Sequence, residues 1–244
     1  MERRRLLEAA GLGAALLAAH RAHGQGPGIS TATGDGAMND ARHGRLRVVI
    51  LHGAYGRPDS NWFPWLAERV QAAGHEALLP RFPTPQGQFP EAWLDAYGRQ
   101  VDNAVPRSRT VLVAHSLGVA FALRLAARAG AAAPYRGALL AAGFWGALGL
   151  PDYDPINAPF FAPLDWKAVR AGCGAGVACY AGDDDPYVPL RFSREIAERL
   201  GAPLRIIPGG KHLNAENGMT TFPELAADLD TLLAAPPAAR PGAP

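Results

Sequence analysis

Three residue types that together carry out nucleophilic catalysis follow apolar runs of this chain in the order Ser, Asp, His. Ser116 lies in AHSLG, between the apolar run 110–114 and an amphipathic stretch that begins at Leu117. A small-x-Ser-x-small turn between a strand and a helix is the nucleophile elbow, which exposes the hydroxyl above the sheet. Ala114 stands where Gly is commoner, a difference of one methyl group. The pattern predicts Ser116 as a nucleophile and the Leu117 N–H, at a helix N-terminus, as an oxyanion donor.

The acid and the base are predicted from two later turns. GDDDPYVP follows the apolar run 176–181, and its last aspartate, three residues after a Gly and directly before a Pro, predicts Asp185 as the acid. Asp184 is the second choice, and Asp183 is expected to solvate the turn. His212 in GGKHLN follows the last apolar run and is the one histidine C-terminal to these aspartates. Ser, Asp and His follow one another in this order in α/β-hydrolases.

The turn HGAYG, directly after the first apolar run, predicts the second oxyanion donor. We assign it to the backbone N–H of Ala54, with Gly53 as the alternative, and expect His52 to form structural hydrogen bonds. Aromatic side chains near these turns are candidates for an apolar substrate pocket, which would bind an acyl group: Tyr55, Phe144, Trp145 and Phe160.

The elements that must position these residues alternate along the chain. Short apolar runs predict strands buried on both faces, at residues 46–51, 77–79, 110–114, 137–142, 176–181 and 204–207. Amphipathic stretches between and after them predict helices, at residues 61–73, 89–104, 117–129, 190–200 and 223–233. The alternation predicts an α/β fold, a mostly parallel sheet covered by helices on both faces.

Two segments leave alternatives open. The aromatic, Pro-rich stretch 144–166 does not fit the alternation, and it either lies over the crevice at the carboxyl ends of the strands or packs as a surface loop. Cys173 and Cys179 lack the spacing of a zinc site, so we expect two unpaired structural cysteines, with a short-range disulfide as the alternative.

Length and charge exclude several classes of protein. The chain of 244 residues predicts one folded domain, at residues 45–236, with a frayed tail at 237–244. The net charge of +2 and the absence of a basic stripe with interleaved aromatics give no support to nucleic-acid binding.

Residues 1–44 combine a cationic start, a short apolar stretch and a polar linker. With Arg3-Arg4, this segment resembles a twin-arginine export signal, and its apolar stretch is too short to span a membrane. A true start at Met38 would instead indicate a cytoplasmic protein.

From about residue 47 to residue 233 the chain resembles the small bacterial serine hydrolases similar to retinoblastoma-binding protein 9. The resemblance rests on VVILHGAYG, NWFPWLAERV, VLVAHSLGVAFALRLA, PLDWKAV, GDDDPYVP and GGKHLNAENG. It implies an α/β-hydrolase fold, a three-layer sandwich with a minimal cap or none, and a triad that maps onto Ser116, Asp185 and His212. Members of this family are described as esterases or peptidases.

These residues together predict hydrolysis of an ester or amide through an acyl-enzyme on Ser116, with an ester favoured over a peptide. No metal or organic cofactor is expected, and the expected partner is a small-molecule substrate; a protein partner is not indicated. Two alternatives remain. The fold could serve as a catalytically idle interaction module, or the same triad could transfer the acyl group to an acceptor other than water, as an acyltransferase or perhydrolase does.

Overall fold

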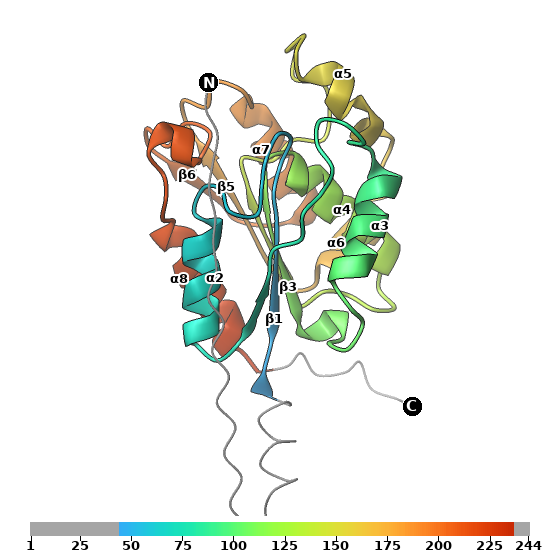
Figure 1. The fold of residues 1–244 in the computed structure, drawn as a ribbon, viewed down its shortest axis with the longest axis vertical. Helices are drawn as coiled ribbons and strands as arrows, with labels where there is room; N and C mark the ends of the chain where they lie inside the picture. The colour runs from blue at the N-terminus through green and yellow to red at the C-terminus, as the bar shows by residue number, and fades with distance from the viewer. Residues whose placement is uncertain (1–43, 237–244) are drawn as a thin grey trace, which may run out of the picture. The chain divides into compact units, whose positions relative to one another are not determined.

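The computed structural model describes residues 44–236, and its centre is one sheet of six parallel strands (Figure 1). The strands stand side by side in the order β2-β1-β3-β4-β5-β6, and every pairing is parallel. Their bounds are β1 (Arg47–Leu51), β2 (Glu76–Leu78), β3 (Thr110–His115), β4 (Gly137–Ala141), β5 (Gly176–Gly182) and β6 (Leu204–Ile207). The prediction of a mostly parallel sheet is confirmed.

Burial explains why continuous apolar runs became strands. Every residue of β1, β3 and β4 is buried, because helices cover both faces of these central strands. The edge strands β2 and β6 are only partly buried, and β6 carries the exposed Arg205 and Ile206. The most apolar runs therefore occupy the middle of the sheet, where the residues that follow them are most firmly placed.

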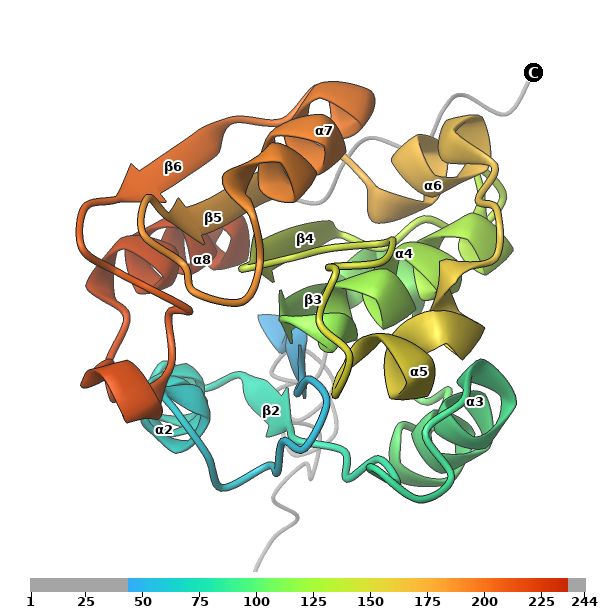
Figure 2. The same ribbon diagram turned by 90° about the horizontal axis from the view of Figure 1, so that it is seen from above.

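Helices form a layer on each face of the sheet (Figures 1 and 2). The apolar faces of α2 (Phe63–Ala72) and α8 (Pro223–Ala234) pack into one core cluster with strand side chains. The other cluster is covered by α3 (Pro90–Gln100), α4 (Leu117–Ala129), α6 (Trp166–Cys173) and α7 (Leu190–Leu200). The three-layer α/β-hydrolase sandwich is thus confirmed.

Local signals account for the differences from the predicted helices. The first begins two residues late, at Phe63, because Asn61 has a positive φ of 56°. The second ends at Gln100, since the following residue is extended. The helix α6 was not predicted; Asp165 caps it by accepting hydrogen bonds from two backbone N–H groups. The aromatic and Pro-rich residues before Asp165 had hidden this start signal.

The sheet order creates a crevice beside β1. From β1 the chain passes to β2 on one side, and it returns to β3 on the other side. In open α/β sheets, the loops after two such strands separate at their carboxyl ends, where ligands bind. The turn after β1 holds Gly53 and Ala54, and the turn after β3 holds Ser116. The topology therefore places the predicted nucleophile and oxyanion donors at one crevice.

The stretch 144–166 lies over this crevice, which favours the first of its two interpretations (Figure 2). It contains the short helix α5 (Asp154–Asn157) and the 3-10 turn Ala158–Phe161. Asp154 fixes its shape by accepting hydrogen bonds from three successive backbone N–H groups, at Leu148, Gly149 and Leu150.

Cys173 and Cys179 are both free and buried, so the alternative of a disulfide is wrong. Burial raises the pKa of each thiol to about 12. Within residues 44–236, no helix has the length and apolarity that crossing a membrane requires. The predicted export segment and tail lie outside the described residues, and the domain boundaries stay a prediction.

Candidate active site

Ser116 occupies a strained turn between β3 and α4. Its backbone has φ 57° and ψ −126°, which a residue with a side chain rarely adopts, and its N–H donates to the Ala141 carbonyl at 2.9 Å. The strain persists because β3 and α4 are both buried around it. The turn also needs small neighbours. A Cβ at Gly118 would lie 2.5 Å from the Leu51 carbonyl oxygen, and one at Gly53 would lie 2.7 Å from the Ser116 Cβ.

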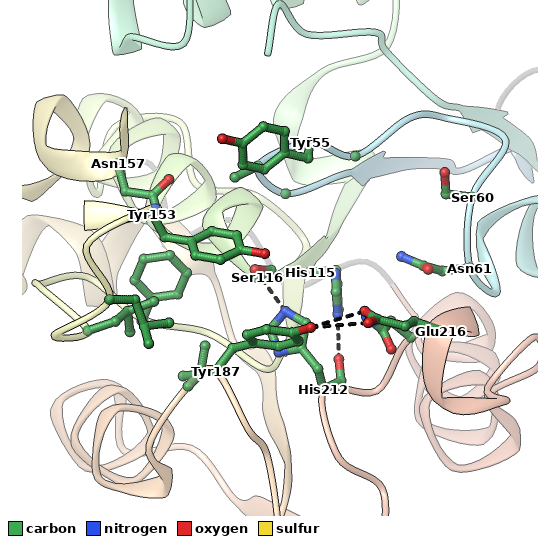
Figure 3. A pocket seen from close by; sticks show the side chains of 18 residues that line it. Tyr55, Ser60, Asn61, His115, Ser116, Tyr153, Asn157, Tyr187, His212 and Glu216 are labelled. Atoms are coloured by element: carbon green, nitrogen blue, oxygen red, sulfur yellow. Dashed lines mark hydrogen bonds between the residues drawn. The ribbon is translucent and has the colours of Figure 1, made fainter. Parts of the chain in front are cut away.

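Ser116, His212 and Asp185 form one hydrogen-bonded row (Figure 3 shows the first pair). The distance from Ser116 Oγ to His212 Nε2 is 3.1 Å, and from His212 Nδ1 to Asp185 Oδ2 it is 2.9 Å. The imidazole and carboxylate side chains are only 10% and 4% exposed. The second oxygen of Asp185, Oδ1, accepts the backbone N–H groups of Tyr187 and Val188 at 2.9 and 3.0 Å. The carboxylate is therefore fixed on both sides.

The other two aspartates of the acidic turn hold the loop that carries the histidine. Asp183 accepts the Gly209 N–H at 2.8 Å. Asp184 accepts the Lys211 N–H at 2.8 Å and forms an ion pair with its ammonium at 3.1 Å. These bonds lower the pKa of Asp184, the backbone N–H being the largest cause. The expectation that Asp183 merely solvates the turn was wrong, because its carboxylate bridges two loops.

Two buried side chains donate hydrogen bonds to backbone carbonyls of the loop that carries His212. His115 Nε2 donates to the His212 carbonyl at 2.8 Å, and Trp62 Nε1 donates to the next carbonyl, that of Leu213, at 2.9 Å (the first bond is drawn in Figure 3). Burial, with His212 as a second cause, lowers the pKa of His115 to about 3. His115 is thus a neutral donor, and because it directly precedes Ser116, it couples the elbow to the histidine loop.

We expect His115→Leu to lower kcat by about 10- to 100-fold with little change in KM, because misplacing a reacting group by about 1 Å costs this much. His115→Gln, which keeps an amide donor, should restore much of the loss. Steady-state kinetics and the pH profile of kcat check this, with melting temperatures to separate lost stability from lost positioning. Equal kcat values for the Leu and Gln variants would contradict the assigned hydrogen bond.

His52 fixes the turn after β1. Its Nε2 accepts the Phe82 N–H at 3.0 Å, so the proton is on Nδ1, which donates to the Gly53 carbonyl at 2.8 Å. Burial lowers the pKa of His52, which keeps the ring neutral. The Gly53 carbonyl also accepts the Gly56 N–H at 3.1 Å. In a trans peptide the N–H points opposite to the carbonyl, so these bonds also set the direction of the Ala54 N–H.

The N–H groups of Ala54 and Leu117 are available to a ligand. In the part of the chain that the structure describes, neither donates a hydrogen bond to a protein acceptor. Ala54 lines the cavity beside Ser116, and Leu117 is the first residue of α4, where the helix dipole favours negative charge. This arrangement can bind an oxyanion.

A cavity of about 260 Å³ opens above Ser116 and His212 (Figure 3). Of the predicted pocket residues, Tyr55 and Phe144 line it. Several other lining side chains were not predicted, and they come from separate segments of the chain: Ser60, Asn61, Leu148, Leu150, Tyr153, Asn157, Tyr187, Val188, Asn214 and Glu216.

Trp145 and Phe160 do not line the cavity, which corrects their predicted place. Phe160 is 1% exposed and packs in the core against Trp93 at 4.9 Å between ring centroids. Trp145 packs against Trp166 at 5.4 Å between ring centroids and is not among the lining residues. Both are aromatic and near Phe144 in sequence, but composition does not reveal which way each side chain of an irregular segment points.

No cluster of three or more His, Cys, Asp or Glu side chains within residues 44–236 could hold a metal ion.

Comparison with known proteins identifies the family. The family model described as serine hydrolase matches residues 48–231. YdeN of Bacillus subtilis, named a hydrolase, is 30% identical over 177 residues, 72% of this chain and 90% of its own. The crystal structure of the ydeN gene product superposes with a TM-score of 0.68 at 28% identity, covering 78% of this chain and all of the other.

A more distant relative agrees with this result. The serine hydrolase RBBP9 of Rattus norvegicus is 24% identical over 161 residues, 65% of this chain and 82% of its own. Est1E of Butyrivibrio proteoclasticus, at 15% identity and a TM-score of 0.59, covers 78% of this chain and 89% of its own, and shares the fold. The predicted resemblance is confirmed, and the chain belongs to the serine hydrolase family.

Proposed function

We propose that this serine hydrolase cleaves a carboxylic ester or amide through an acyl-enzyme on Ser116. The observation that carries the proposal is the hydrogen-bonded row of Ser116, His212 and Asp185. His212 Nε2 accepts the hydroxyl proton while Ser116 Oγ attacks the carbonyl carbon. The tetrahedral oxyanion binds the N–H groups of Ala54 and Leu117. His212 then gives the proton to the leaving group, and water releases the acyl group by the same steps.

Asp185 acts in this mechanism by orienting the base. Its carboxylate accepts a hydrogen bond from the N–H at Nδ1 of His212. Nε2 therefore carries no proton and can accept the proton of Ser116. When His212 becomes cationic, the carboxylate at 2.9 Å stabilises the imidazolium. The two backbone N–H groups on Asp185 Oδ1 keep the carboxylate in place during both states.

We propose an ester of a small molecule over a peptide because of the cavity. A volume of about 260 Å³ fits a small acyl group, and the segment 144–166 bounds it. Small-molecule sites are concave pockets that combine apolar walls with polar groups, and this cavity has both. A protease would need an extended cleft for the chain on both sides of the scissile bond.

Activity profiling tests this proposal. The protein is incubated with esters of short- and long-chain acids and with aminoacyl amides, and a fluorophosphonate probe reports whether Ser116 is nucleophilic. We expect labelling at Ser116 and faster turnover of esters than of amides. An unlabelled protein would favour the idle interaction module. Acyl transfer to an added alcohol or to peroxide at the expense of hydrolysis would favour an acyltransferase or perhydrolase.

A further inference from the structure

The two ends of the cavity differ in chemistry. Ser60, Asn61 and Glu216 lie on one side of the Ser116–His212 pair, whereas Tyr153 and Asn157 lie on the other (Figure 3). The cavity wall also includes four apolar side chains: Phe144, Leu148, Leu150 and Val188. The side that holds Glu216 differs from the other by a carboxylate, so the site can bind a substrate that is charged on one side of the scissile bond and uncharged on the other.

Glu216 gives its end of the cavity a negative charge. Its carboxylate accepts hydrogen bonds from the Tyr187 hydroxyl at 3.1 and 3.3 Å and from Asn214 Nδ2 at 3.5 Å. Both donors are neutral, and no lysine or arginine within residues 44–236 forms an ion pair with Glu216. Glu216 is the one carboxylic acid among the residues that line this cavity, and no lysine or arginine lines it. The charge is thus held in position but not neutralised.

Tyr187 connects the Glu216 carboxylate to His212, the general base of the proposed reaction. The ring of Tyr187 packs against the imidazole of His212 at 5.2 Å between centroids, and its hydroxyl reaches Glu216. Glu216 follows His212 by four residues in the same loop, and Asn61 holds that loop by accepting the Ala215 N–H at 3.1 Å. Glu216 therefore lies about one tyrosine ring from the imidazole.

The direction of proton transfer identifies which part of the substrate meets this charge. His212 must protonate the leaving atom, so the leaving group lies on the His212 side of the attacked carbon. That side contains Glu216, whereas the uncharged side with Tyr153 and Asn157 is left for the acyl group.

We infer that the preferred leaving group carries a cationic nitrogen, as in an amino-alcohol ester, and that Glu216 determines this specificity. The inference rests on the proposed function, because it needs an acyl-transfer reaction at Ser116. An anionic leaving group would be repelled by the same charge. Because Glu216 is exposed, the effect is moderate, of the size of a surface ion pair.

The test compares the choline ester and the 3,3-dimethylbutyl ester of one short-chain acid, which differ by a charged nitrogen in place of a carbon. Acid release is measured for the wild type and for Glu216→Gln, which removes the charge and keeps an acceptor for Tyr187. Glu224→Gln is the matched control, because Glu224 is an exposed residue in the first turn of α8, outside the cavity lining. A third ester carries trimethylammonium on the acyl side instead.

We expect the ratio of kcat/KM, choline ester over neutral ester, to fall about fivefold in Glu216→Gln and to stay unchanged in Glu224→Gln. Added salt should reduce the wild-type ratio. A ratio that Glu216→Gln leaves unchanged would overturn the inference, as would a charge preference that appears only with the acyl-side cation.

Failure of the inference is distinguishable from failure of the proposed function. If neither ester is cleaved but a fluorophosphonate labels Ser116, protection against labelling by choline and by 3,3-dimethylbutanol replaces turnover as the measurement. Equal protection by the two alcohols would overturn the cation preference alone. Absence of labelling at Ser116 would overturn the proposed function and the inference with it.

Discussion

Ser116→Ala is expected to fold normally and to hydrolyse esters on the order of 10⁴-fold more slowly or worse than the wild type. The variant loses Oγ, the atom 3.1 Å from His212 Nε2, so no acyl-enzyme can form. The fold should survive because the elbow is held by the backbone: the Ser116 N–H donates to the Ala141 carbonyl, and α4 begins directly afterwards. Alanine meets the same backbone strain as serine at this positive φ.

Three measurements check this expectation. Initial rates on a cleavable ester give the loss, a fluorophosphonate probe should no longer label the variant, and a thermal melt should match the wild type. Ser108→Ala is the control, because Ser108 is exposed in the 3-10 turn Arg107–Arg109 before β3, whereas Ser116 follows the other end of that strand. If Ser116→Ala retains a tenth of the wild-type rate, Ser116 is not the nucleophile.

The fold was predictable because burial and apolarity coincide along this chain. The strands β1, β3 and β4 are apolar except at their ends, where Arg47, Thr110 and His115 lie, and they are buried along their whole length. A strand, a small-x-Ser-x-small turn and an amphipathic helix then leave little freedom at Ser116, because Gly118 is needed where α4 approaches the end of β1. The short-range pattern thus determined both the element and the direction of the hydroxyl.

The pocket was harder to predict because its walls come from loops. Tyr153, Tyr187 and Glu216 lie in three separate segments, and their contacts arise only when the strand ends meet at the crevice. Nothing local in the sequence distinguishes Tyr153 and Tyr187, which line the cavity, from Trp145 and Phe160, which pack against other side chains. Aromatic composition identified the right segment, but the direction of each side chain depends on tertiary packing.

The hydrogen bonds of the acidic turn at residues 183–185 also depend on contacts between loops that are distant in sequence. The position of Asp185 before Pro186 indicated which aspartate meets the histidine, but no local sign showed that all three contact the loop at residues 209–212. Which oxygen reaches which donor depends on how closely two loops approach. Gly182 permits that approach, since a Cβ there would lie 2.1 Å from the Lys211 carbonyl oxygen.

Asp185→Asn is expected to lower kcat by about 10³- to 10⁴-fold, a loss that follows from which atoms surround the side chain. Two backbone N–H groups point at Oδ1, so the amide oxygen of asparagine should take that place. The amide NH₂ then faces His212 Nδ1, where Oδ2 was. Because NH₂ donates, Nδ1 must accept, which moves the ring proton to Nε2. His212 can then no longer take the proton of Ser116.

Asp184→Asn is the matched control, since it makes the same change one residue earlier. Its amide oxygen can still accept the Lys211 N–H, and the exposed ion pair with the Lys211 ammonium contributes little in water. We expect kcat within about threefold of the wild type. Both variants are assayed for ester hydrolysis at several pH values, with melting temperatures alongside. A larger loss in Asp184→Asn than in Asp185→Asn would shift the acid by one residue, because only the residue that holds the Nδ1 proton can produce the tautomer effect.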